Sequence, residues 1–311
     1  MKTYTVLKNC KTKKGGTGTT NTKKKGVVLT NYAGFYYVED ENGMIFTCKI
    51  RGKLKSRVIT GDQVIFSPTN DTEGMIENVL SRINQLERPR IANISLALIV
   101  LAVNEPKPDL FLLDRLLWLT HYHRIRPCIV LNKSDLPPDS ETLKIQRAYC
   151  EPYFQCIAVS SRTSEGIAEI KAVINREIAV MAGPSGVGKT SLLNLLLPGI
   201  EQRTQTISQK MQRGRHTTRH VELYSLPDSG WIADTPGFSQ LEMPPIDRWS
   251  IADYFPDFAP YIPHCRFRDC LHHKENDCAV KVAVENGEIL RERHEHYLMM
   301  VEEASIKEKK Y

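Results

Sequence analysis

The sequence predicts a multi-domain α/β protein with three folded parts of different character. Residues 26–86 contain short β-rich runs separated by turn signals, residues 87–243 alternate strands with helices, and residues 244–311 are rich in cysteine, histidine and charge. Short strands with frequent turns favour a small barrel, whereas strand–helix alternation favours a parallel sheet with helices on both faces. We therefore expect a barrel, a layered central domain and a helical C-terminal domain.

Residues 1–25 form a basic arm ahead of the barrel. The arm holds eight lysines and no acid, while the rest of the chain carries 34 basic and 36 acidic side chains. Its Lys, Thr and Gly composition lacks the apolar area that a folded core requires, so we expect a flexible segment. Such an arm serves either as a solubilising tail or as a contact for a polyanion such as RNA.

The barrel is predicted from its turns and carries a stripe of positive charge. Asn42-Gly43 predicts a tight hairpin between two β-rich runs. Further along, five cations occupy alternate positions, which share one face if the segment is a single strand. A solvated face is the simpler explanation, but five cations without an acid favour nucleic acid. The predicted RNA-binding residues are Lys49, Arg51, Lys53, Lys55 and Arg57.

The elements of the central domain follow from hydrophobic pattern and capping. The continuous apolar run at 96–103 predicts a strand covered on both faces. Asp109 is an expected N-cap for a leucine-rich helix over 110–122. Further strands are predicted over 127–131, 155–159, 178–181 and 231–234, and further helices over 141–150, 167–176 and 281–310.

One loop of this domain fits the phosphate-binding pattern G-x-x-x-x-G-K-[ST] and lies between a predicted strand and a predicted helix. Glycines let backbone N–H groups curl around phosphates, the lysine neutralises their charge, and the helix start favours an anion. An ordinary glycine-rich turn is the alternative. The predicted nucleotide-binding residues here are Gly183, Pro184, Ser185, Gly186, Val187, Gly188, Lys189, Thr190 and Ser191.

A second motif predicts which base the nucleotide carries. Asn132, Lys133, Ser134 and Asp135 follow a predicted strand and fit N-K-x-D. A carboxylate such as that of Asp135 accepts from the N1–H and N2 amine of guanine, whereas adenine offers no such pair of donors on that edge. Alone this motif is often only a turn, but beside a phosphate loop it predicts guanine recognition. Ser160 and Ser161, after the next strand, are expected to complete the base pocket.

Magnesium and γ-phosphate contacts are predicted farther along. Asp234-Thr-Pro-Gly237 fits D-x-x-G, in which Asp234 holds Mg²⁺ through water and the N–H of Gly237 senses the γ-phosphate. Thr190 of the phosphate loop is a direct Mg²⁺ ligand in this pattern. Thr217 and Thr218 are both candidates for the switch threonine.

The order of these parts is rotated relative to most GTPases. The base motifs at 132 and 160 precede the phosphate loop at 183, the switch threonine and D-x-x-G. A circular permutation has this effect without altering the site, because domain termini often lie close together. The sequence therefore predicts a circularly permuted P-loop GTPase domain over 87–243, in which Gly237 leads directly into the C-terminal domain.

The hydrolytic residue is predicted by elimination. Phe238 follows Gly237, where a water-orienting glutamine is found in Ras-like enzymes, and phenylalanine offers no polar group. His216, in the predicted switch, is our candidate catalytic residue. Contact with RNA or simple exposure are the alternatives for this histidine.

A metal site is predicted near the C-terminus. Cys265, Cys270, His272 and Cys278 supply three thiolates and one imidazole, the donor set of a closed structural zinc site. His273 and His264 compete for the nitrogen position, and unrelated reduced cysteines are the alternative. We expect no disulfide framework, and free buried thiols at Cys128 and Cys156.

Together these motifs are similar to those of the bacterial ribosome small-subunit-dependent GTPase A family. The resemblance covers about residues 26–300 and rests on the phosphate loop, Gly214-Arg-His-Thr-Thr218, Asp-Thr-Pro-Gly-Phe238 and the metal cluster. It implies an oligonucleotide/oligosaccharide-binding (OB) barrel at 26–86, a zinc-binding domain at 244–311, and one zinc ion beside GTP and Mg²⁺. In this family the switch histidine is taken as catalytic.

The resemblance also implies a biological role. The family acts late in maturation of the 30S small ribosomal subunit, binds 16S rRNA in its GTP state and leaves after hydrolysis. The alternatives are a GTP-gated RNA-binding checkpoint with little catalysis and a permuted GTPase acting on the large subunit. No window of about 18 uncharged apolar residues could span a membrane, and the N-terminus has no apolar run that resembles a signal peptide, so we expect a cytoplasmic protein. We also expect a monomer.

Overall fold

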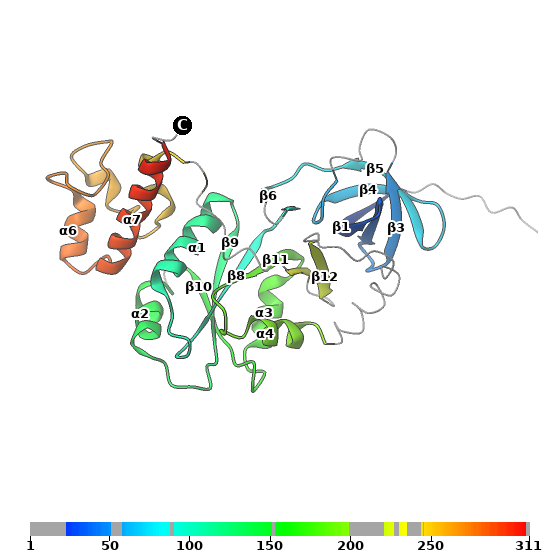
Figure 1. Cartoon of the computed structure of the whole chain (residues 1–311), viewed down its shortest axis with the longest axis horizontal. Coiled ribbons are helices and arrows are strands. Elements are labelled where there is room, and N and C mark those ends of the chain that lie inside the picture. The colour runs from blue at the N-terminus through cyan, green and yellow to red at the C-terminus, as the bar shows by residue number, and fades with distance from the viewer. Residues whose placement is uncertain are drawn as a thin grey trace, which may run out of the picture.

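The computed structural model describes residues 23–50, 58–87, 90–150, 153–198, 221–226, 230–234, 244 and 246–308. Within them the chain forms a barrel, a six-stranded sheet with helices on both faces, and a C-terminal helical part (Figure 1). The barrel and the C-terminal part flank the sheet domain on opposite sides in this view. None of the helices within the described ranges is long and apolar enough to cross a membrane.

The barrel confirms the predicted OB-type architecture. Its strands are β1 (Lys24–Tyr32), β2 (Phe35–Asp40), β3 (Ile45–Ile50), β4 (Gln63–Pro68) and β5 (Glu73–Val79), closed in the order β1-β2-β3-β5-β4. β2 and β3 are antiparallel across the predicted Asn42-Gly43 turn, where Gly43 has a φ of 76° that favours glycine. The interior is apolar and includes Val28, Phe46 and Phe66.

Two predictions at the barrel are only partly covered by the described residues. β1 begins at Lys24, so the last two residues of the expected basic arm belong to the barrel, because Lys24–Val27 pair with β4 and the Lys24 ammonium binds the Asp40 carboxylate at 2.7 Å. Of the cationic stripe, Lys49 is exposed on β3 and its ammonium lies 5.3 Å from the Phe35 ring. The other four residues of the stripe lie outside the described ranges.

The sheet has the order β10-β9-β8-β11-β13-β12. Five strands are parallel: β8 (Leu96–Ala102), β9 (Arg126–Asn132), β10 (Gln155–Ala158), β11 (Glu177–Ala182) and β13 (Gly230–Asp234). The edge strand β12 (Glu222–Leu226) is antiparallel to β13, so the predicted all-parallel sheet is mixed. The short sequence of β12 does not indicate whether this strand runs parallel or antiparallel to its neighbour.

Helices cover both faces of the sheet, as predicted. α1 (Leu110–Tyr122) and α2 (Ser140–Ala148) contribute to the apolar core on one face, and α3 (Ile167–Ile174) and α4 (Lys189–Leu196) to the core on the other. The side chain of Asp109 caps α1 by accepting from the N–H of Leu112 at 3.0 Å. A short hairpin, β6 (Gln85–Glu87) and β7 (Arg90–Ala92), joins the barrel to β8.

The C-terminal part packs on α1. It contains short 3₁₀ turns (Arg248–Ser250, Ala252–Tyr254 and Ile262–His264), α6 (Ala279–Glu285) and α7 (Arg291–Glu308). The predicted helical segment over 281–310 is present as two helices, because the chain breaks near Gly287, whose φ of 77° is left-handed. Trp118 and Leu119 of α1 lie in one apolar core with Phe255, Phe258 and Tyr297.

The cysteine prediction is correct for Cys128 and wrong for Cys156. Cys128 is a buried free thiol on β9. Cys156 instead forms a disulfide with Cys150, whose Cα lies 5.5 Å away. The end of α2 turns back through an isolated bridge between Cys150 and Phe154, which brings the two cysteines together.

Candidate functional site

The predicted nucleotide motifs gather at one edge of the sheet. Asn132, Val159 and Ala182 each end or directly follow a parallel strand, and Asp234 ends a fourth. The carboxyl ends of parallel strands meet at one edge, where open α/β sheets bind their ligands. The motifs at 132, 160, 183 and 234 therefore lie at the same edge, although they are separated along the chain.

Asn132 joins three of these motifs. Its side chain is fully buried; Nδ2 donates to the carbonyl oxygen of Val187 at 2.7 Å, and Oδ1 accepts from the N–H of Ser161 at 3.1 Å. The closeness requires glycine at 188, because a Cβ there would lie 2.3 Å from the Asn132 amide nitrogen. The base motif, the serine loop and the phosphate loop are thus connected to one another through Asn132.

Asp135 is held by the serine loop. One carboxylate oxygen accepts from the Ser160 hydroxyl at 2.5 Å, and the other accepts from the Arg162 guanidinium at 2.9 Å. The Ser160 hydroxyl and then Arg162 lower the pKa of the Asp135 carboxyl, so it is an anion at neutral pH. Arg162 was not predicted, and its side chain is largely exposed.

Lys133 and Ser134 shape the loop between Asn132 and Asp135. Lys133 has a left-handed φ of 63°, which costs a non-glycine residue free energy and is typical of functional turns. Its ammonium donates to the carbonyl of Glu105 in the loop after β8. The N–H of Ser134 donates to the carbonyl of Val159 at 3.0 Å, which binds this loop to the end of β10.

The phosphate loop runs from the end of β11 to the start of α4. Gly183 has a φ of 132°, and a Cβ there would lie 2.1 Å from the carbonyl oxygen of Val100. The Lys189 ammonium donates to the carbonyls of Gly183 and Pro184, at 2.8 and 2.5 Å, and burial lowers its pKa. Ser185, Gly186, Thr190 and Ser191 are exposed on this loop and the first turn of α4.

Several predicted residues have no described side chain. Asp234 is placed by its backbone at the end of β13, while His216, Thr217, Thr218 and Gly237 lie outside the described residues. A pocket of about 460 Å³ lined by Arg124, Arg126 and Phe154 lies at the amino ends of β9 and β10. That is the opposite edge of the sheet, so this pocket is not the motif site.

The predicted metal ligands converge as a compact cluster. The ligand atoms of Cys265, Cys270, His272 and Cys278 all lie within 4.8 Å of one another. His272 Nδ1 lies 3.5 Å from the Cys265 sulfur and 3.3 Å from the Cys278 sulfur. Ligands of one tetrahedral zinc ion are about 3.5–3.8 Å apart, given its usual bond lengths, so these donors fit that ion. His264 and His273 are both exposed outside the cluster.

Neighbouring groups orient the cluster. The Glu275 carboxylate accepts from the N–H groups of Leu271 and His273, at 2.9 and 2.8 Å. The carbonyl of Leu271 accepts from the Tyr297 hydroxyl at 3.1 Å, which connects the loop to α7. The spacing of the cysteines predicted the ligand set, but nothing local in the sequence predicted this support from α7.

The fold and the motif edge together define a circularly permuted GTPase. The family model described as RsgA GTPase matches residues 77–244, and the RsgA N-terminal domain model matches residues 25–76. The chain belongs to the RsgA GTPase family and is a GTP hydrolase.

Named relatives and solved structures agree with this assignment. A protein of Moorella thermoacetica called small ribosomal subunit biogenesis GTPase RsgA is 44% identical over 290 residues, covering 92% of this chain and 99% of that protein. One of the same name from Carboxydothermus hydrogenoformans is 44% identical over 289 residues, again covering 92% and 99%. The crystal structure of YjeQ from Thermotoga maritima matches with a TM-score of 0.78 and 34% identity over 91% of this chain and 99% of its own. YloQ, described as a circularly permuted GTPase, matches with a TM-score of 0.78 and 35% identity over 94% and 99%.

Proposed function

We propose that this protein is a GTPase that acts in biogenesis of the small ribosomal subunit. The observation that carries the chemistry is the set of hydrogen bonds by which Asn132 connects the N-K-S-D motif to Val187 and Ser161. The names of the relatives supply the biological context. Barrel and GTPase domain occur together in both this chain and these relatives, which supports a common role.

In this proposal Asp135 recognises guanine. Its carboxylate already accepts from an N–H group of Arg162 and from a hydroxyl, so it accepts equally from the two donors of the guanine edge. Asn132, Lys133, Ser134, Ser160 and Ser161 hold the loops around the base. Residues 183–191 bind the phosphates, with Lys189 moving from loop carbonyls to the β- and γ-phosphates.

Magnesium and the attacking water have separate partners in this proposal. Thr190, one of Thr217 and Thr218, and Asp234 would hold Mg²⁺, which neutralises phosphate charge. Gly237 contacts the γ-phosphate. His216 orients the water, because Phe238 provides no polar group at the position beside Gly237.

The C-terminal cluster holds one structural zinc ion per chain in this proposal. Four protein donors fill a tetrahedral shell and leave no open position for substrate. The ion would join the loop of Cys265–Cys278 into one unit that α7 supports through Tyr297.

The barrel provides the RNA contact. Lys49 and the four cations at 51–57 would bind 16S rRNA phosphates, consistent with the use of OB barrels for nucleic acids. The protein would act as a cytoplasmic monomer that binds the 30S subunit with GTP and leaves after hydrolysis. The basic arm at 1–25 has no assigned role.

The test is multiple-turnover phosphate release from GTP, titrated with purified small subunits. We expect turnover to rise with small subunits and to stay at its basal level with large subunits. A protein that binds small subunits with a non-hydrolysable GTP analogue, but is not stimulated by them, would be a checkpoint. Stimulation by large subunits alone would contradict the proposal. His216→Ala is expected to reduce turnover strongly and leave GTP affinity nearly unchanged.

A further inference from the structure

The barrel and the edge of the sheet share one apolar core. Side chains of β1 alternate between two environments: Val28 faces the barrel interior, whereas Val27 and Leu29 belong to the core of the sheet domain. Leu223 of β12 lies in that same core. The barrel is therefore packed against β12 through these residues.

Two barrel threonines bind a single carbonyl at the start of β12. The hydroxyls of Thr30 and Thr60 donate to the carbonyl oxygen of Val221, at 3.4 and 3.1 Å. Both threonines are 4% exposed. A carbonyl oxygen has two lone pairs, so both hydroxyls bind it at once. Val221 is the third residue after Thr218 and the first described residue after the predicted switch segment, so these two bonds hold the chain close in sequence to that segment.

A barrel carboxylate binds both strands that follow. Glu39 of β2 is 8% exposed and accepts from the Ser225 hydroxyl at 2.5 Å and from the Trp231 indole N–H. Ser225 and Trp231 are paired across β12 and β13. Trp231 comes three residues before Asp234, so this contact holds β13 close to the residue that we assign to Mg²⁺.

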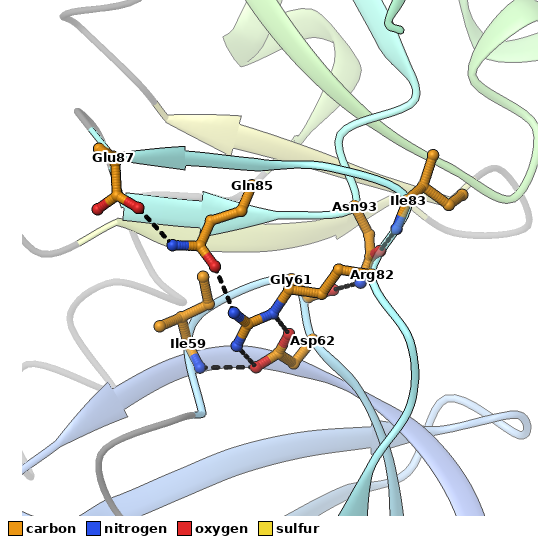
Figure 2. A network of polar contacts seen from close by, with 8 residues as sticks. All are labelled: Ile59, Gly61, Asp62, Arg82, Ile83, Gln85, Glu87 and Asn93. Carbon is orange, nitrogen blue, oxygen red and sulfur yellow. Dashed lines mark hydrogen bonds and ion pairs between the residues drawn. The ribbon is translucent and has the colours of Figure 1, made fainter. Parts of the chain in front are cut away.

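The segment that carries Thr60 is itself fixed on both sides. Figure 2 shows the Asp62 carboxylate accepting from the N–H of Ile59 at 2.8 Å and from the guanidinium of Arg82. The Asn93 amide donates to the carbonyl of Gly61 at 2.9 Å. A Cβ at Gly61 would lie 2.1 Å from the carbonyl oxygen of Ala92. Residues 58–62, which hold Thr60 in place, are thus fixed by these contacts. They follow directly after residues 51–57, the segment with four cations.

We propose that Thr30, Thr60 and Glu39 are positioning residues for GTP hydrolysis. They hold Val221, which follows His216 along the chain, and Trp231, which precedes Asp234. The barrel thereby sets the geometry of the hydrolytic groups. The proposal rests on the function proposed above, because it assigns hydrolysis to His216.

The experiment compares two double variants that differ in the hydroxyl. Thr30→Val/Thr60→Val keeps the side-chain shape and removes both donors, whereas Thr30→Ser/Thr60→Ser keeps both donors and removes two methyl groups. Thr47→Val is the matched control, because Thr47 lies on β3 and pairs with Tyr37 and Glu73 within the barrel. Phosphate release is measured with and without small subunits, together with KM for GTP, GDP affinity and Tm.

We expect the valine double variant to lose about tenfold in kcat, since each lost buried hydrogen bond in a transition-state arrangement is worth roughly threefold. KM and GDP affinity should stay within about twofold of wild type, because the base pocket is not touched. The serine double variant and Thr47→Val should retain kcat. Thr60→Val alone gives an intermediate loss if the double valine variant does not fold.

Other outcomes separate the two proposals. An unchanged kcat in the valine variants, with or without a lower Tm, would show that these contacts only stabilise the fold and would overturn the inference. An equal kcat loss in the serine variant would do the same. If small subunits fail to stimulate the wild type, the proposed partner is wrong. The positioning role is still decided by comparing the basal kcat of the valine double variant with that of the serine double variant.

Discussion

The amide nitrogen of Asn132 lies 2.7 Å from the carbonyl oxygen of Val187, a residue 55 positions later in the chain. This single contact joins the end of β9 to the phosphate loop after β11. In a GTPase with the usual order of motifs, the phosphate loop comes before the N-K-x-D loop along the chain, whereas here it comes after. The contact therefore brings together two motifs whose order along the chain is rotated.

Asn132→Ala is expected to weaken both the fold and nucleotide binding. The change leaves the Val187 carbonyl and the Ser161 N–H without this partner, at a cost of about 1–3 kcal/mol in the free energy of unfolding. GDP and GTP affinities should both fall, measured by fluorescence titration. Asn104→Ala is the control, because Asn104 donates to a carbonyl at the surface. Equal losses in both variants would contradict a special role for Asn132.

Asp135→Asn is expected to change base specificity. An amide offers one donor and one acceptor, so it no longer accepts from both guanine donors, and GTP affinity should fall roughly 100-fold or more. Xanthosine triphosphate, which carries an oxygen in place of the N2 amine, should gain affinity. Competition binding measures both. Asp109→Asn, at the N-cap of α1 where Asn caps equally well, should bind like wild type; GTP binding unaffected by Asp135→Asn would refute the base contact.

Removal of the metal is expected to destabilise the C-terminal part. Elemental analysis of purified protein should give about one zinc per chain, and a strong chelator should lower Tm because structural zinc contributes to folding. His272→Gln should lose the metal, whereas His273→Gln should keep it, since His273 is exposed outside the cluster. Stoichiometric zinc in the His272 variant would mean that another residue supplies the nitrogen ligand.

Arg293→Met is expected to be strongly destabilising. Arg293 is 3% exposed and binds the carboxylates of Asp114 and Asp257, and its guanidinium lies 4.8 Å from the Tyr149 ring. Burial alone would lower the pKa of Arg293, but Asp114 and Asp257 raise it, so the cation persists. Removing one partner of a buried ion pair costs about 3–5 kcal/mol.

Arg115→Met provides the matched control for that change. Arg115 binds Glu303 at a partly exposed position, where an ion pair contributes about 1 kcal/mol or less. Urea unfolding gives both free energies. A similar small loss for both arginines would show that the Arg293 cluster adds no stability.

Acid is expected to destabilise the fold partly through His121. Burial, and then the nearby charge of Arg293, lower the pKa of His121 below its ordinary value of 6.5. Protons therefore bind the unfolded chain first, and stability falls as pH decreases through 6.5 toward the folded pKa. His121→Gln should flatten the dependence of Tm on pH between about 7 and 5, whereas His264→Gln, at an exposed position, should leave it unchanged. A wild-type slope in His121→Gln would remove this residue as the cause.

Local sequence patterns predicted many of the helices and strands. They gave no sign of the hydrogen bonds between residues far apart in the chain. The helix at 110–122 was bounded correctly because Asp109 and a leucine-rich run are local signals. The phosphate loop and the four metal ligands follow from spacing. The bond from Thr60 to Val221 joins residues 161 positions apart and that from Arg293 to Asp114 spans 179; neither leaves a periodic trace. The disulfide between Cys150 and Cys156 depends on a turn that no sequence motif predicts.

The attachment of the C-terminal part has a practical consequence for any shortened chain. Arg293 forms an ion pair with the buried Asp114, the His296 ring hydrogen-bonds the same carboxylate, and Phe255 and Tyr297 share a core with Trp118 on α1. A chain cut before residue 246 would leave a carboxylate in an apolar surface without its cation and would expose the side of α1 that faces away from the sheet. We therefore expect that the GTPase domain does not fold properly without the C-terminal part, and that kinetic measurements require the full-length protein.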